Sequence, residues 1–301
     1  MENKKAEVDI ILPNYNSAEF IDKTIQGVIN QSYLKWRLII VDDFSNKKTQ
    51  AKIKKYKKLK KIKIFWLKRN RGAAFCRNYG IRNSNSKYIA FLDSDDIWHN
   101  NKIEKCMKKL SLGYDLVCHA ETWFYEEDQK TRKVIYGPES HELFDRLLFE
   151  GNCLSTSAVM VNRKILEDTP FFSEDEKFIT AEDYHLWLKL AKHNVRFGFL
   201  DQILGKCRIH EGNNSGFPIK NMMAVKSVFT DYYDKIKNPS LKIKILAWRR
   251  LAIIEYSGAR GLQRNREHFR ALITFIKAIA RWPFIPKFYL AFLFNIFHLK
   301  L

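Results

Sequence analysis

Residues 88–96 read YIAFLDSDD, a short apolar run that ends abruptly in acidic residues. Runs of four or five apolar residues rich in β-branched and aromatic types are typical of buried strands. Three similar runs precede it: VDIIL at 8–12, RLIIV at 37–41 and IKIFW at 62–66. Stretches with helical spacing of apolar residues lie between the runs, at 19–31, 47–59 and 73–82. This alternation predicts an α/β fold, a doubly wound parallel sheet with helices on its faces.

The second half of the chain contains longer β-like runs with helices between them. The runs are 115–125, 155–161 and 195–208, and helices are expected at 139–149 and 181–193. This pattern predicts an α+β half that completes a pocket at the sheet. Beyond Pro218 the sequence becomes mostly helical, basic and aromatic. We therefore expect one domain over residues 1–217 and a helical C-terminal region over residues 218–301.

Composition excludes several classes of protein. The 301 residues are 46% hydrophobic and 14% aromatic, which excludes disordered, collagen-like and coiled-coil chains. The 5 cysteines lie far apart and form no C-x-x-C pair, so neither a zinc site nor a disulfide framework is expected. The N-terminal segment lacks the long apolar region of a signal peptide. A cytoplasmic protein with reduced thiols is the simplest interpretation.

Positive charge is concentrated in two zones. The formal net charge is +20, and residues 44–92 contain sixteen Lys or Arg but no Asp or Glu. Residues 240–301 contain twelve basic residues and two acidic ones. Such zones attract phosphate groups, whether of nucleic acid, anionic lipid or a diphosphate substrate. Charge alone does not choose among these partners.

Polar side chains follow three of the predicted strands. They are Pro13-Asn14-Tyr15-Asn16, Asp42-Asp43 and Asp93-Ser94-Asp95-Asp96. Because ligands of open α/β sheets bind beyond the carboxyl ends of the strands, we expect these segments to share one site. Crowded carboxylates repel one another unless a hard cation such as Mg²⁺ or Mn²⁺ neutralises them, and that cation also holds substrate phosphates. The D-x-D tripeptide alone fits equally well an acidic turn that caps a helix expected near His99.

Five segments together resemble the successive motifs of the bacterial family 2 glycosyltransferases, which have the GT-A fold. They are IILPNYNSAEFIDKTIQGVINQSY (10–33), LIIVDDFSN (38–46), NRGAAFCRNYGI (70–81), YIAFLDSDD (88–96) and TAEDYHLWLKLA (180–191). They occur in the family's order and cover about residues 7–215. The resemblance implies a Rossmann-like nucleotide-binding half over about 1–100, an acceptor half over 101–217 and a mixed central sheet. It also implies transfer of a sugar from a nucleoside-diphosphate sugar, usually a UDP-sugar, to a hydroxyl group with inversion at the anomeric carbon.

The resemblance assigns the metal and diphosphate to the D-x-D segment. Asp95 is implied as the direct ligand of Mn²⁺ or Mg²⁺, and Asp93 lies nearer the ribose and can share the metal. Ser94 belongs to the same donor-binding set, and Asp96 supports either neighbour. His210, in an R-x-H segment typical of these enzymes, would complete the metal shell or donate to the leaving diphosphate. A lone histidine is also often structural, and that alternative stays open here.

The nucleoside is assigned to the first two strand ends, again by resemblance. Pro13, Tyr15 and Asn16 match the loop that holds the uracil, and a Tyr ring can stack on a base. Asp43 matches the residue that accepts a hydrogen bond from the base, with Asp42 beside it. These five residues, with the D-x-D segment, make up the expected nucleotide-binding face.

Arginines are expected to bind the diphosphate. Gly72 permits a tight turn, and Arg77 on the following helix can present a fork of donors to phosphate oxygens. Arg71 is a weaker candidate, and Arg208 of the R-x-H segment joins the donor-binding set. An ordinary surface arginine is the alternative for Arg77.

The acidic pair in TAEDYHLW is the expected acceptor-side machinery. Glu182 and Asp183 fall in the first turn of an amphipathic helix, whose positive end keeps a carboxylate ionised. The resemblance makes Asp183 the general base for the acceptor hydroxyl and Glu182 its neighbour that contacts the acceptor or positions the base. Compensation of the helix dipole without a catalytic role is the alternative.

The C-terminal region predicts contact with a membrane. Arg266, Arg270, Lys277 and Arg281 fall within about 60° of one another on a helical wheel, with apolar residues on the other side. Such basic amphipathic helices lie on anionic membranes, here followed by many aromatic residues. Pro283, Pro286 and Lys287 interrupt the stretch and argue against a span. A helical hairpin packed on the catalytic domain is the alternative.

A membrane position agrees with the acceptor that the resemblance implies. Relatives of this type often extend oligosaccharides on a polyprenyl-diphosphate carrier at the cytoplasmic face, as in O-antigen or capsule synthesis. A nucleic-acid-binding protein is the rival suggested by charge, but it does not explain carboxylates at strand ends. A metal-dependent nucleotidyltransferase would need a Gly-rich loop after the first strand, and Pro13-Asn14-Tyr15-Asn16 is not one. We therefore expect no nucleic-acid partner.

Overall fold

The chain forms two compact units in a computed structural model that describes residues 6–126, 129–169, 171–210 and 217–299. The first unit comprises Met1–His141, Cys153–Ser173 and Lys189–His210. The second comprises Glu142–Asn152, Glu174–Leu188 and Glu211–Leu301. The expected domain boundary at residue 217 stays a prediction. Two segments expected in the acceptor half, Glu142–Asn152 and Glu174–Leu188, group with the C-terminal helices in the second unit.

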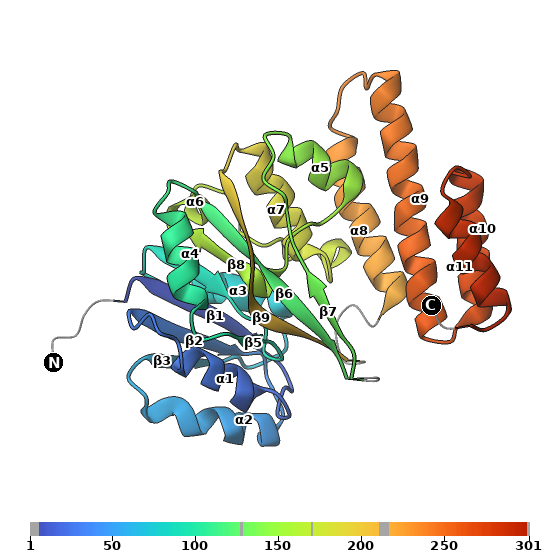
Figure 1. Ribbon diagram of the computed structural model, residues 1–301. Helices are drawn as coiled ribbons and strands as arrows, with labels where there is room; N and C mark the ends of the chain where they lie inside the picture. Colours follow the sequence, from blue (N-terminus) through green and yellow to red (C-terminus); the bar gives the residue numbers. More distant parts are fainter. Residues whose placement is uncertain (1–5, 127–128, 170, 211–216, 300–301) are drawn as a thin grey trace. The chain divides into compact units, whose positions relative to one another are not determined.

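A mixed sheet of nine strands is the framework of the first unit, as far as the described residues show (Figure 1). The strands are β1 (Val8–Asn14), β2 (Trp36–Asp42), β3 (Ile62–Trp66), β4 (Tyr88–Phe91), β5 (Ile97–Trp98), β6 (Leu116–Tyr125), β7 (Thr131–Val134), β8 (Val159–Asn162) and β9 (Phe197–Ile209). Their order is β3-β2-β1-β4-β8-β6-β9-β5, with β7 paired to β6.

The four N-terminal strands are parallel, which confirms the doubly wound arrangement predicted for residues 8–92. In register, Ile10 of β1 lies opposite Leu38 of β2 and Ala90 of β4. β8 then joins antiparallel to β4, so the sheet is mixed, as the family resemblance implied. The strand predicted from residue 155 is wrong at its start, because Thr156–Ala158 form a 3-10 turn (η2) before β8 begins.

Helices cover both faces of the parallel part of the sheet. α1 (Ile21–Ile29), α2 (Lys47–Lys54) and α4 (Lys102–Leu110) share a core with the side chains of Ile10 and Leu12. On the opposite face, α3 (Ala73–Arg82) places Gly80 against Ile11 of β1. A Cβ at Gly80 would lie 2.6 Å from the Ile11 side chain, so this close approach requires glycine. The remaining short helices of the first unit are η1 (Lys55–Lys58) and α6 (Arg163–Glu167).

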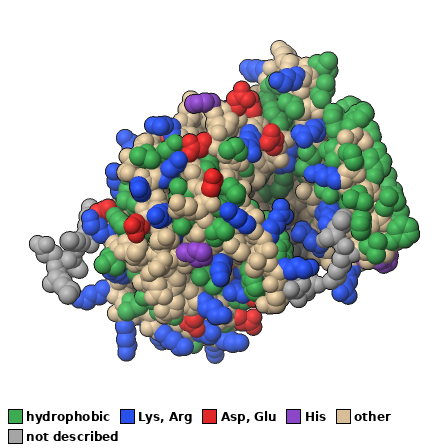
Figure 2. All heavy atoms as spheres, viewed as in Figure 1, with side chains coloured by type: hydrophobic (Ala, Val, Ile, Leu, Met, Phe, Trp, Pro, Cys, Tyr) green, Lys and Arg blue, Asp and Glu red, His purple; other side chains and the backbone are tan. Residues whose placement is uncertain are grey.

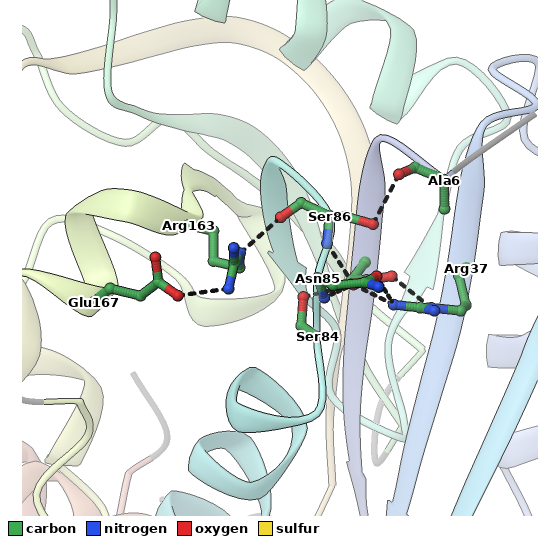
Figure 3. Close-up of polar contacts among 8 residues, drawn as sticks. Ala6, Arg37, Ser84, Asn85, Ser86, Arg163 and Glu167 are labelled. Carbon is green, nitrogen blue, oxygen red and sulfur yellow. Dashed lines mark hydrogen bonds and ion pairs between the residues drawn. The ribbon is translucent and has the colours of Figure 1, made fainter.

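The buried Asp9 carboxylate near the amino end of β1 binds the segment before β4, and Figure 3 shows its partners Arg37, Ser84, Asn85 and Ser86. Asp9 accepts two hydrogen bonds of 2.8 Å from the Arg37 guanidinium, one from the Ser84 hydroxyl, and others from the backbone N–H groups of Asn85 and Ser86. Burial disfavours its ionisation, but the hydrogen bonds from Arg37 and Ser84 outweigh this effect and lower the pKa of Asp9. The network joins β1, β2 and the segment before β4.

The second unit is helical in its described part. Its helices are α5 (Leu143–Glu150), η3 (Glu176–Phe178), the first part of α7 (Glu182–Lys192), α8 (Pro218–Tyr233), α9 (Leu241–Arg264), α10 (His268–Arg281) and α11 (Pro286–Ile296). Leu262 of α9, Phe275 of α10 and Ala291 of α11 share one fully buried cluster. Within the described ranges, none of the helices combines the length and the apolar character needed to cross a bilayer.

Candidate active site

The D-x-D segment lies at the carboxyl end of β4, where the residues from 93 to 96 turn away from the sheet. The Asp93 carboxylate pairs with the Arg77 guanidinium at 2.7 Å, and the Asp93 backbone N–H donates to the Ser157 hydroxyl at 3.0 Å. The Asp95 carboxylate lies 3.1 Å from Nε2 of His210. α4 begins at Lys102, well after Asp96, so the segment is not a cap for that helix.

Arg77 is buried beside the D-x-D segment. Its side chain is 7% exposed, and its guanidinium also lies over the Phe172 ring at 5.3 Å. A buried arginine beside Asp93 is not an ordinary surface arginine, which removes that alternative.

Asp96 and Glu121 are buried acids of the same region. The Asp96 carboxylate accepts a hydrogen bond from the Arg208 backbone N–H at 2.9 Å, and the Tyr136 hydroxyl donates to Glu121 at 2.8 Å. Burial, and then repulsion from Asp95, raises the pKa of Asp96 well above its ordinary value. Burial raises the pKa of Glu121 to about 7. Sequence inspection missed Glu121, because an acid inside a β-like run carries no local signal.

The R-x-H segment at the end of β9 returns to the D-x-D segment. The Arg208 guanidinium donates to Glu126 at 2.5 Å and to the Asp95 carbonyl at 3.3 Å. It lies over the Phe20 ring at 4.9 Å, and the His210 ring packs on the same Phe20 at a centroid distance of 4.7 Å. The structure thus brings His210 to Asp95 as predicted, whereas Arg208 fastens the surrounding loops together.

A small cavity opens beside Asp95. Its volume is about 200 Å³, and Thr122, Phe124, Lys206 and Arg208 contribute to its wall. Among the described residues no group of three or more His, Cys, Asp or Glu side chains could enclose a metal ion. Asp95 and His210, 3.1 Å apart, could hold a metal ion only together with water and substrate phosphates as its remaining ligands.

The first two strand ends form a connected polar edge. Asn14 donates from its side-chain amide to Asp42 at 2.7 Å and to the Ser45 hydroxyl at 3.1 Å. Asp43 accepts hydrogen bonds from the backbone N–H groups of Arg71 and Gly72, at 2.7 and 2.8 Å. Gly72 has φ of 84°, a conformation that favours glycine. Asp43, expected near the base, therefore also fixes the loop before α3. The spacing of residues in the sequence does not predict this contact.

Two of the residues expected to hold the base differ in exposure. Pro13 is buried within β1, while the Tyr15 ring is 54% exposed and available for stacking. Asn16 lies beside it with φ of 52°, and its side-chain oxygen accepts a hydrogen bond from the Asn46 backbone N–H at 2.8 Å. Ser94 also belongs to this edge of the sheet, since its carbonyl accepts a hydrogen bond from Thr24 of α1.

The acidic pair at the start of α7 belongs to the second unit. The Glu182 carboxylate accepts a hydrogen bond from the Thr180 backbone N–H at 2.9 Å, and Asp183 accepts one from the Tyr184 N–H at 2.6 Å. The Tyr184 hydroxyl donates to the Leu147 carbonyl of α5 at 2.6 Å, which anchors this turn. The catalytic roles of Glu182 and Asp183 stay predictions.

Comparison with known proteins identifies the family. The model of glycosyl transferase family 2 matches residues 9–169, more than half of the chain. The chain therefore belongs to glycosyl transferase family 2, and its fold is the GT-A fold with C-terminal helices added.

Two curated relatives are similar over most of the chain. The putative teichuronic acid biosynthesis glycosyltransferase TuaG of Bacillus subtilis is 29% identical over 218 residues, 69% of this chain and 81% of TuaG. WfgD of Escherichia coli, a UDP-Glc:alpha-D-GlcNAc-diphosphoundecaprenol beta-1,3-glucosyltransferase, is 29% identical over 244 residues, 79% of this chain and 90% of WfgD.

Solved structures share the fold at low sequence identity. Staphylococcus aureus TarS residues 1–349, in complex with UDP-GlcNAc, superpose with a TM-score of 0.59 and 18% identity over 91% of this chain and 88% of that one. The mannosyltransferase PcManGT of Pyrobaculum calidifontis, in complex with GDP-Man and Mn²⁺, gives 0.63 and 15% over 98% and 86%.

Proposed function

We propose that this family 2 glycosyltransferase is an inverting, metal-dependent hexosyltransferase that uses a UDP-sugar. Its acceptor would be a hydroxyl of a glycan carried on polyprenyl diphosphate, in the synthesis of a surface polysaccharide such as O-antigen or capsule. The observation that carries the proposal is the approach of His210 to Asp95, 3.1 Å apart at the carboxyl end of β4. The UDP-GlcNAc in the TarS complex and the diphosphoundecaprenol acceptor in the name of WfgD support the donor and acceptor classes.

On the donor side, Asp95 and His210 would hold Mn²⁺ or Mg²⁺, and Asp93 is the third candidate ligand. When bound, such an ion neutralises negative charge on the leaving diphosphate. The exposed Tyr15 ring provides a face on which the uracil can stack. Asp43 keeps acceptor capacity beyond its two backbone partners, because a carboxylate offers about four lone-pair sites.

On the acceptor side, Asp183 would take the proton of the attacking hydroxyl. It lies in the first turn of α7, where the helix dipole favours the ionised carboxylate needed for a base. Glu182, held by the Thr180 N–H, would position the base or contact the acceptor. Attack on the face opposite the leaving UDP inverts the anomeric carbon in a single displacement, so no covalent enzyme intermediate forms.

A polyprenyl carrier is embedded in a membrane, and this sets the proposed location. We place the enzyme in the cytoplasm, on the inner face of the bacterial cytoplasmic membrane, with the C-terminal helices at the anionic surface. Donor sugars are then taken from the cytoplasm and acceptors from the membrane.

Calorimetric titration of UDP into the full chain, with and without Mn²⁺, tests the donor site. We expect metal-dependent binding that weakens at least about tenfold in Asp95→Asn, since one charged ligand is lost. Asp201→Asn is the matched control, because Asp201 is an exposed carboxylate of β9 in the same unit. Equal UDP affinity of the wild type and Asp95→Asn would overturn the assignment.

A further inference from the structure

Helix α10 is apolar on two opposite sides, and the described residues cover only one of them. Its buried side consists of Ala271, Thr274, Phe275 and Ala278. Phe269, Ile273 and Ile276 are 75%, 40% and 51% exposed. At about 100° per residue these three side chains fall within about 60° of one another, on the side roughly opposite Ala271 and Ala278. An amphipathic helix that only packs on its neighbours would be polar there.

Helix α11 repeats the pattern. Phe288, Ala291 and Asn295 face inward, while Tyr289, Leu290, Leu293 and Ile296 are exposed. Asn295 fixes the two helices to each other, since its side-chain amide donates to the His268 carbonyl at 2.9 Å. Phe284, in the connection between them, is 76% exposed.

The exposed apolar side chains gather on these two helices and on the connection between them. Figure 2 shows hydrophobic side chains gathered over α10 and α11 in the view of Figure 1. We call this surface the α10–α11 face, and its members are Phe269, Ile273, Ile276, Phe284, Tyr289, Leu290, Leu293, Ile296 and Phe297. Contiguous exposed apolar surfaces of this extent mark interaction sites.

The charges around the face select its partner. Residues 268–299 contain four basic residues and no acidic one. Arg281 is neutralised by a bidentate pair with Glu255, and Arg270 pairs with Glu267, while Lys277 and Lys287 are exposed. Apolar and aromatic side chains beside lysines, with no carboxylate within residues 268–299, match a surface of anionic lipid.

The dimensions fit insertion into the interface. α10 has 14 residues and α11 has 11, so their lengths are only about 21 and 17 Å at 1.5 Å per residue. The hydrocarbon core is about 30 Å thick, which neither helix can cross. An exposed face along a short helix pair instead suits helices that lie parallel to the bilayer plane.

We propose that the α10–α11 face inserts into the interfacial layer of an anionic membrane. The inference deepens the membrane partner of the proposed function and rests on it for its purpose, which is to hold the enzyme beside a lipid-linked acceptor. The helical wheel alone predicts the apolar residues of this helix on one side, opposite the basic ones. The apolar residues divide between a buried side and a lipid-facing side, with lysines at the margin.

Cosedimentation of the full chain with vesicles tests the proposal. Vesicles of phosphatidylcholine with about 30% phosphatidylglycerol are compared with pure phosphatidylcholine. We expect binding to the anionic vesicles, lowered at least about tenfold in Phe269→Gln/Ile273→Gln/Ile276→Gln. The matched control is Leu34→Gln/Leu112→Gln/Ile135→Gln, which removes three exposed apolar side chains from the first unit and should bind like the wild type. Glutamine maintains helix propensity at these exposed positions.

The possible outcomes separate this proposal from the donor chemistry. Unchanged vesicle binding by the α10 triple variant would overturn it. A wild type that is dimeric without lipid and becomes monomeric in the triple variant, as judged by sedimentation, would assign the face to a second copy of the chain and also overturn it. UDP titration on the same samples reports the donor site independently, so a wild type that binds UDP but does not bind the anionic vesicles refutes the membrane face alone.

Discussion

At the scale of single residues, the acidic segment after β4 is held in place by residues that belong to none of the family motifs. The Ser157 hydroxyl accepts a hydrogen bond from the Asp93 N–H at 3.0 Å, and the Ser157 carbonyl accepts one from the Trp98 indole N–H at 2.9 Å. Both Ser157 and Trp98 are buried. Ser157 is therefore a positioning residue for the D-x-D segment.

Replacing Ser157 by alanine leaves the Asp93 N–H without that acceptor. We expect a loss of about 1–2 kcal/mol in unfolding free energy, together with weaker Mn²⁺-dependent UDP binding, by about five- to tenfold. Urea denaturation and calorimetry measure the two effects. Ser111→Ala, at an exposed serine, should change neither. Loss of stability with unchanged UDP affinity would make Ser157 merely structural.

Asp183 is expected to act on turnover rather than on the donor. Asp183→Asn removes the base but keeps the size of the side chain, so we expect UDP affinity near that of the wild type and transfer reduced at least about a hundredfold. Glu176→Gln, an exposed acid of η3 in the same unit, is the control. Transfer at the wild-type rate in Asp183→Asn would leave only helix-dipole compensation as its role.

At the scale of elements, Asp9 links β1, β2 and the segment before β4. Asp9→Asn breaks the buried pair with Arg37, and we expect it to lower the unfolding free energy by about 3–5 kcal/mol at neutral pH. Because folding lowers the pKa of Asp9, its contribution is present above the ordinary value of 3.8 and is lost as the pH falls through the lower folded value. The difference between wild type and variant should therefore shrink in acid. Urea denaturation at pH 7 and pH 3 checks this, and a constant difference would contradict it.

The prediction of helices and strands from the sequence was most accurate where the apolar residues follow a single helical or strand-like spacing. The strand expected at 62–66 and the helix expected at 73–82 match β3 and α3 in their bounds. β5 and β7, with two and four residues, were not predicted, because such short edge pieces depend on tertiary pairing with β9 and β6. The helix expected over 47–59 ends early as a 3-10 turn within a lysine-rich run.

At the scale of the whole molecule, the sequence indicates the residues of the candidate donor site better than the residues that hold them in place. Asp95 and His210 are 115 residues apart, and their contact follows from the family resemblance and from the return of β9 to β5. Glu121, Glu126 and Ser157 could not be recognised, because each acts through a partner distant in the chain. The two-sided character of α10 was hidden for a similar reason: periodicity marks apolar positions, but not what covers them.

The most direct test of the central claim is the identity of the products formed by the full chain. UDP-sugars are supplied with membranes that contain polyprenyl-diphosphate-linked glycans, and the released nucleotide is identified by mass spectrometry. We predict UDP as the released nucleotide, an acceptor heavier by one hexose, and at least about a hundredfold less of both from Asp95→Asn. Release of sugar 1-phosphate with a uridylyl group on the acceptor, or equal UDP release by Asp95→Asn, would contradict the account.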